Sequence, residues 1–66
     1  MGILKFQVGD VVRVKDCQVA RDAGYVGAKG TIVFYRHRLY GVLFDRVLNL
    51  VMGYYSGELE LVEKAE

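Results

Sequence analysis

Residues 30–45 of the chain read Gly30-Thr31-Ile32-Val33-Phe34-Tyr35-Arg36-His37-Arg38-Leu39-Tyr40-Gly41-Val42-Leu43-Phe44-Asp45. Two apolar runs, rich in aromatic and β-branched residues, flank the short polar segment Arg36-His37-Arg38. Such runs are typical of strands, and a short polar connection between two of them is typical of a β-hairpin. The stretch therefore predicts a hairpin with an exposed tip.

Side chains alternate between the two faces of a strand, so the hairpin also predicts which residues face the core. In the first strand, Ile32 and Phe34 are expected to share one face. In the second strand, the alternation places Tyr40, Val42 and Phe44 together on the core face.

The rest of the chain predicts three further short strands and no second domain. Val12 and Val14 share one face of a strand over residues 11–15, which is followed by a long polar loop over residues 16–26. Residues 53–56 are expected to end a strand, and residues 60–62 to form the last one. Five short strands in 66 residues predict an all-β fold, a small closed barrel in which residues 1–66 form one domain with its core at about 6–62.

In this pattern the chain resembles an SH3-like five-stranded small barrel with a long loop after the first strand. The resemblance rests on four segments, which are residues 9–14, 27–32, 40–45 and 59–62. It is similar to the KOW-type motif of ribosomal and transcription-factor proteins and to accessory subunits of photosynthetic electron-transfer complexes of the PsaE type. The resemblance implies a binding or accessory role for the barrel. It specifies the fold of the chain more closely than its function.

Composition excludes several classes of protein. No apolar run approaches the length of a membrane span, so no membrane association is expected. The chain has one cysteine, Cys17, and one histidine, His37, which cannot alone form a structural zinc site, and no cofactor is expected. A single cysteine allows no internal disulfide, which fits a reducing cytoplasm. No catalytic constellation is visible, so we expect a protein that is not an enzyme.

Residues 47–52 are unusual because a connection between strands is normally polar, whereas five of these six residues are apolar. They either form an exposed interaction patch or extend the hairpin and bury alternate side chains, and the sequence leaves both interpretations open. The first interpretation predicts a protein partner or a homo-oligomer. The predicted partner-binding residues are Tyr25, Leu48, Leu50, Met52, Tyr54 and Tyr55.

Charge is divided unevenly along the chain. Residues 1–46 contain eight Lys and Arg against four Asp, a balance of +4, whereas residues 47–66 contain one Lys against four Glu, a balance of −3. A basic surface with interleaved aromatic side chains is the pattern of a nucleic-acid-binding module. This alternative function uses Lys29, Tyr35, Arg36, His37 and Arg38.

The sequence therefore leads to three functional expectations of different classes. The first is a non-enzymatic protein-interaction module or accessory subunit that can self-associate through residues 47–52. The second is a KOW-like nucleic-acid-binding module. The third is an oligomeric barrel that binds a small molecule.

Overall fold

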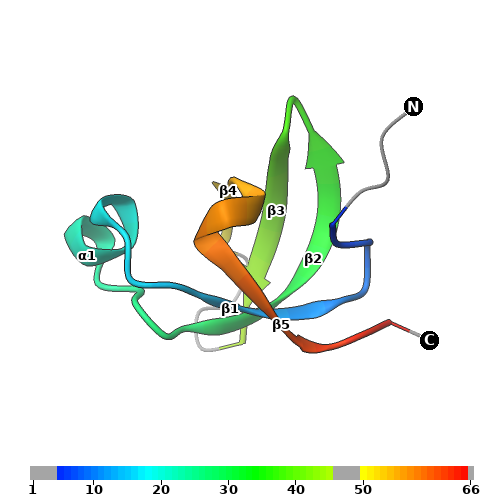
Figure 1. Cartoon of the computed structure of the whole chain (residues 1–66), viewed down its shortest axis with the longest axis horizontal. Coiled ribbons are helices and arrows are strands. Elements are labelled where there is room, and N and C mark those ends of the chain that lie inside the picture. The colour runs from blue at the N-terminus through cyan, green and yellow to red at the C-terminus, as the bar shows by residue number, and fades with distance from the viewer. Residues whose placement is uncertain (1–4, 46–49, 66) are drawn as a thin grey trace.

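The computed structural model describes residues 5–45 and 50–65, and these residues form a five-stranded antiparallel sheet (Figure 1). The predicted all-β class and number of strands are confirmed. The strands are β1 (Val11–Val14), β2 (Lys29–Arg36), β3 (Leu39–Phe44), β4 (Val51–Tyr54) and β5 (Leu59–Glu63). Two short helical segments accompany the strands: the α-helix α1 (Gln18–Ala23) and the 3-10 helix η1 (Ser56–Glu58).

The sheet is open, and the predicted closure into a cylinder is wrong. Its strand order is β4-β3-β2-β1-β5, so β4 and β5 are the two edges, and no pairing between them occurs within residues 5–45 and 50–65. The physical reason is the path of the chain after β4. η1 turns the chain, and β5 then pairs with the free side of β1 instead of with β4 (Figure 1).

The core follows the alternation that the sequence predicts for β1 and β3. Val12 and Val14 are buried on β1, and the three predicted residues of β3 are buried as well. Phe6 packs edge-on against Tyr40 with 5.4 Å between the ring centroids. The buried apolar residues are Phe6, Val12, Val14, Ala20, Ile32, Tyr40, Val42, Phe44, Tyr54 and Leu59.

The predicted alternation fails in the middle of β2, where a β-bulge adds one residue. Ile32 pairs with Val42, but the next pair in register is Phe34 with Gly41, so Val33 is the extra residue. A bulge of this kind reverses the faces of all the side chains that follow it. Consequently Ile32 is buried while Phe34 is 45% exposed, and the prediction that they share one face is wrong.

The predicted long loop after β1 contains the short helix α1. Arg21 N–H donates to the carbonyl of Cys17 at 2.9 Å, and Gln18 Nε2 donates to Asp22 Oδ1 at 2.8 Å. Residues four apart meet on one side of a helix, which is how these polar side chains stabilise a single turn. Gly24 ends the helix with φ 77°, a left-handed conformation that glycine adopts without strain.

Asp10 ties the two ends of the described chain together. Its carboxylate is almost completely buried and accepts a hydrogen bond from Gln7 N–H at 3.0 Å and another from Ala65 N–H at 2.7 Å. The pKa of Asp10 is lowered, chiefly by the hydrogen bond from Ala65, while burial acts in the opposite direction. The charged form of Asp10 is therefore the form that the folded state stabilises.

We expect acid to weaken the fold through Asp10. Because its folded pKa lies below its ordinary value near 4, its contribution is complete above that value and is lost as the pH falls through the lower, folded value. Asp10→Asn should lower the free energy of unfolding at pH 7 by about 2 kcal/mol and flatten its decline in acid. Urea unfolding from pH 7 to pH 2 measures both effects, and parallel pH profiles for the two proteins would contradict the role of Asp10.

Gly30 is buried where β2 passes between its two neighbours, opposite Val12 and Phe44. A Cβ atom at this position would lie 2.6 Å from the carbonyl oxygen of Leu43, which is backbone and cannot swing aside. We expect Gly30→Ala to destabilise the protein by about 2 kcal/mol. Gly57→Ala, in open space, is the matched control and should change stability by less than about 0.5 kcal/mol in the same urea titration.

Candidate functional site

The solvent-facing side of β2, β3 and β4 carries an apolar surface, which we call the outer face. Strand pairing sets its composition, because Thr31 pairs with Leu43, Leu43 with Val51 and Arg36 with Leu39. Three of its side chains are well exposed: Phe34 at 45%, Val51 at 40% and Tyr55 at 55%. The apolar members of the outer face are Phe34, Leu39, Leu43, Val51 and Tyr55.

Phe34 takes its position on the outer face because the residue opposite it on β3 is Gly41. A Cβ atom on Gly41 would lie 2.3 Å from Cε2 of the Phe34 ring, so the ring occupies the space that a side chain would fill. The ring thus covers the backbone of Gly41 and remains 45% exposed to solvent. A glycine in the interior of a strand often marks such a close approach.

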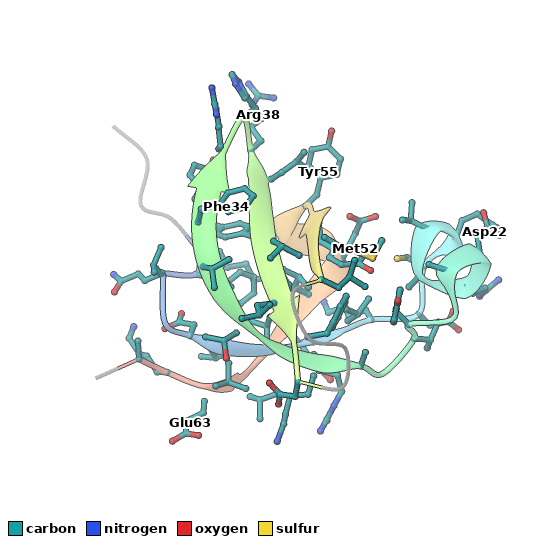
Figure 2. All side chains as sticks on the ribbon, turned by 180° about the vertical axis from the view of Figure 1, so that it is seen from behind. Asp22, Phe34, Arg38, Met52, Tyr55 and Glu63 are labelled. Atoms are coloured by element: carbon teal, nitrogen blue, oxygen red, sulfur yellow. The ribbon has the colours of Figure 1, made fainter. Side chains whose placement is uncertain are left out.

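The far side of the outer face ends at Tyr55, directly after β4. Its backbone is fixed by η1, because Tyr55 N–H donates to Glu58 Oε1 at 2.8 Å and its carbonyl accepts from Glu58 N–H at 2.9 Å. Figure 2 shows Tyr55 and Phe34 below the end of the hairpin that carries Arg38. Two exposed aromatic residues, on β2 and directly after β4, therefore flank β3, the middle strand of the outer face.

The hairpin between β2 and β3 ends in a cationic turn, which we call the basic tip: Arg36, His37 and Arg38. All three residues are exposed, as predicted, and none forms an ion pair with the described part of the chain. His37 and Arg38 have φ angles of 51° and 67°. Positive φ at both central positions defines a type I′ turn, for which Asn-Gly is the favoured sequence, so two bulky side chains, those of His37 and Arg38, occupy positions that strain their backbone.

The predicted partner-binding residues fall into different environments. Tyr55 is exposed, whereas Leu50, Met52 and Tyr25 are half-buried against the core, and Leu48 lies outside the described residues. Tyr54 is completely buried, and burial raises its pKa. Of the described members of the predicted set, only Tyr55 reaches the outer face.

The predicted nucleic-acid-binding residues are divided between the two ends of β2. Lys29 begins the strand and Arg36 ends it, so about 23 Å of extended chain separates them. Tyr35 lies on the opposite side of the sheet from Phe34, where its ring tilts against Tyr40 with 4.7 Å between the centroids. The structure therefore brings the three tip residues together and leaves Lys29 apart from them.

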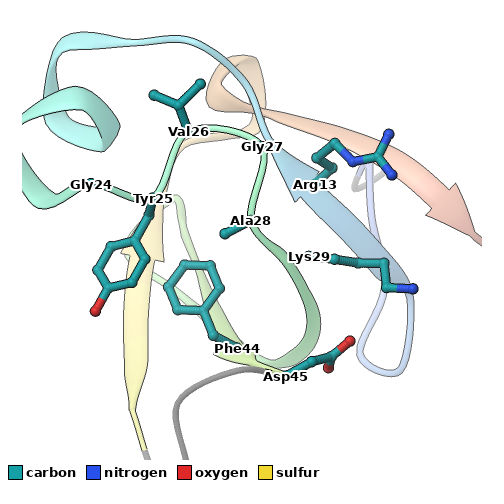
Figure 3. A pocket seen from close by; sticks show the side chains of 9 residues that line it. All are labelled: Arg13, Gly24, Tyr25, Val26, Gly27, Ala28, Lys29, Phe44 and Asp45. Carbon is teal, nitrogen blue, oxygen red and sulfur yellow. The ribbon is translucent and has the colours of Figure 1, made fainter.

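A pocket of about 430 Å³ opens beside the connection between β1 and β2 (Figure 3). Its apolar wall is formed by Tyr25 stacked on Phe44, with 4.7 Å between the ring centroids. Charges of both signs surround it, and Arg13 also approaches Glu60 at 3.9 Å. This pocket is the place where the predicted small-molecule alternative could act. Its described lining consists of Arg13, Gly24, Tyr25, Val26, Gly27, Ala28, Lys29, Phe44 and Asp45.

Within residues 5–45 and 50–65, no three His, Cys, Asp or Glu side chains gather closely enough to hold a metal ion. No helix in the same ranges is long and apolar enough to cross a membrane. A comparison of the chain with protein-family models, curated proteins and solved structures finds no match. Any functional assignment therefore depends on the geometry of the chain itself.

Sequence reasoning missed most of the outer face, namely Phe34, Leu39, Leu43 and Val51. The face of Phe34 depends on a bulge that the apolar run does not reveal. One signal was present, since Gly41 and Gly53 stand inside apolar strand sequence and pair with each other across β3 and β4. Glycines at such positions indicate a bulge or a close approach.

We expect the backbone strain in the basic tip to lower the free energy of unfolding of the protein. Replacing it in part by the favoured turn sequence, His37→Asn with Arg38→Gly, should raise the free energy of unfolding by about 1 kcal/mol. Urea unfolding of the double variant measures the change. His37→Ala with Arg38→Ala removes the same two side chains while keeping the backbone strain, and should give no such gain.

Proposed function

We propose that the protein is a small, non-enzymatic protein-interaction module that binds a partner protein through the outer face. The observation that carries the proposal is the exposed pair Phe34 and Tyr55 beside the basic tip. Exposed apolar patches rimmed by polar residues mark interaction sites on soluble domains. Aromatic and arginine side chains also supply most of the binding energy at protein interfaces.

An SH3-like strand topology, with the sheet left open, is part of the proposal. Three features support it: the antiparallel order β4-β3-β2-β1-β5, the long connection between β1 and β2, and the helical turn η1 directly before β5. Small barrels of this type carry many unrelated functions. The proposed function is accordingly drawn from the surface of the sheet.

Nucleic-acid binding is the second candidate, and the basic tip is the observation that favours it. Phosphate contacts dominate the affinity of nucleic-acid-binding proteins, so several clustered cations are needed. The tip supplies three residues, of which His37 is neutral in the formal charge count, and Lys29 lies too far along β2 to join them. The outer face carries five apolar side chains whereas the basic tip carries two arginines, which favours a protein partner.

A capture experiment tests the proposal. Immobilised protein is incubated with extract of the source organism, and bound proteins are quantified by mass spectrometry before and after treatment of the extract with nuclease. We expect at least one protein to be retained by the unchanged chain after nuclease treatment. The amount of this protein captured by the double variant Phe34→Ser, Tyr55→Ser should fall by at least about tenfold, because hot-spot aromatic side chains contribute about 2 kcal/mol or more each to binding.

The matched control is the double variant Val8→Ser, Val62→Ser, which removes exposed apolar side chains outside the outer face and should retain the partner. Equal loss in both double variants would contradict a specific outer-face site. Loss of all binding after nuclease treatment would favour the second candidate. Sedimentation of the isolated protein separates a further case, because concentration-dependent association that Phe34→Ser abolishes would identify the partner as a second copy.

A further inference from the structure

The edge strand β4 presents unused backbone hydrogen-bonding groups. Phe44 N–H donates to the carbonyl of Leu50, which makes these two residues a hydrogen-bonded pair of the β3–β4 ladder. Such pairs alternate along an antiparallel ladder, so Met52 and Tyr54 direct their peptide groups toward β3. Val51 and Gly53 direct theirs away from the sheet, and neither has a backbone partner there within the described residues.

The opposite edge of the sheet, β5, is poorly suited to pairing. A register shift beside Val12 leaves Val62 as an unpaired extra residue in β5. Glu60 and Glu63 add negative charge to the same strand. Bulges and charged residues are the devices by which natural proteins prevent pairing at an edge. β4 carries neither, so it is the edge that remains available for a further strand.

The surface beside β4 suits apolar side chains. A strand added there would place the side chains opposite Val51 and Gly53 on the outer face, since paired residues share a face. Gly53 has no side chain of its own, and a Cβ at this position would lie 3.5 Å from Leu39. An apolar side chain opposite Gly53 can therefore reach across it to Leu39, with Tyr55 as its neighbour on the same side.

Charge defines one end of the added strand. Leu39 immediately follows the basic tip, and β3 pairs residue Tyr40 with Tyr54, so the tip lies beyond the C-terminal end of β4. Its cations form no ion pair within the described residues. A strand antiparallel to β4 begins at this end, so acidic residues near its N-terminus would meet the tip.

We propose that the β4 edge binds an extended acidic peptide segment of a partner protein by antiparallel strand addition. The segment has two apolar residues two positions apart, opposite Gly53 and Val51, preceded by acidic residues that face the basic tip. This inference rests on the proposed function, because it assigns the partner's chemistry at the same surface. It adds main-chain pairing, which gives affinity, to side-chain pockets, which give specificity.

A single extended segment fits this edge better than a second copy of the whole domain. In both views α1 stands out from the body of the molecule on the side of β4 (Figures 1 and 2). A lone strand needs only about 5 Å of space beside β4, which a peptide segment fills without the bulk of a second domain. Glu60 and Glu63 of a second copy, moreover, lie within its own β5 and its pairing with β1.

The experiment uses the full chain labelled with ¹⁵N and a synthetic probe peptide of two glutamates followed by alternating threonine and valine, with two valines. NMR titration should show the largest shifts at the Val51 and Gly53 amides, together with slower hydrogen exchange of both. Gly53→Pro, which removes one outward N–H and leaves the β3 ladder intact, should weaken the peptide by at least about tenfold. Arg36→Glu with Arg38→Glu should weaken it similarly, and Lys64→Glu should not.

Two N-methylated peptides provide the matched control and need no change to the protein. Methyl groups on the two valine nitrogens block the N–H groups that face β4, and should abolish binding. Methyl groups on the two flanking threonine nitrogens face away from β4, and should leave binding within about threefold of the unmodified peptide.

Each remaining outcome overturns the inference. These outcomes are no binding at about 1 mM peptide, equal effects of the two methylation patterns, or retained affinity in Gly53→Pro. Concentration-dependent shifts of the β4 amides without peptide would show that a second copy of the chain binds this edge. Single-stranded RNA that binds at the tip and displaces the peptide would show that the basic tip is a nucleic-acid-binding site. If these tests fail while the Phe34 and Tyr55 double variant still loses its captured partner, the proposed function stands and strand addition does not.

Discussion

The extra residue at Val33 is the constraint on which the surface of this protein depends. With no bulge, Phe34 would continue the inward alternation of Ile32 and would compete with Tyr40 for space in the core. The bulge instead turns Phe34 outward over Gly41 and brings Tyr35 against Tyr40 on the inner side. One unpaired residue therefore decides which aromatic side chains of the hairpin pack on the inner side of the sheet and which one lies on the outer face.

The glycines complete this division because each creates a different kind of space. Gly30 is required by the backbone of β3, which passes too close for any side chain. Gly41 accommodates the Phe34 ring, and Gly53 leaves an open position beside Leu39. The same residue type thus serves packing at one position and surface shape at the other two, so a count of glycines alone does not distinguish the roles.

The sequence predicted the parts of the fold that obey a local rule. Alternation correctly placed Val12 and Val14, together with the inward residues of β3, because the extra residues of the two bulges lie on β5 and β2 and leave β1 and β3 themselves without an inserted residue. It failed after Ile32, since a bulge depends on the register with a neighbouring strand and leaves no mark in the hydrophobic pattern. The helix α1 was missed for a related reason, as its single turn is held by side-chain contacts such as Gln18 with Asp22 that weak periodicity cannot reveal. Closure of the sheet depends on which strand β5 pairs with after the turn at η1. This pairing is not a local property of the sequence either.

The charge division seen along the chain becomes a spatial division in the folded sheet. The basic tip belongs to the hairpin of β2 and β3, whereas Glu60 and Glu63 belong to β5 at the edge farthest in strand order from β4. The near-neutral total therefore describes neither surface. Because the arginines of the tip lie beside the aromatic outer face and Glu60 and Glu63 lie on the bulged edge, the proposed acidic partner would be attracted to the side of the sheet that carries the tip. In the proposed complex, electrostatic attraction would orient the partner on the sheet, and the apolar side chains of the outer face would hold it there.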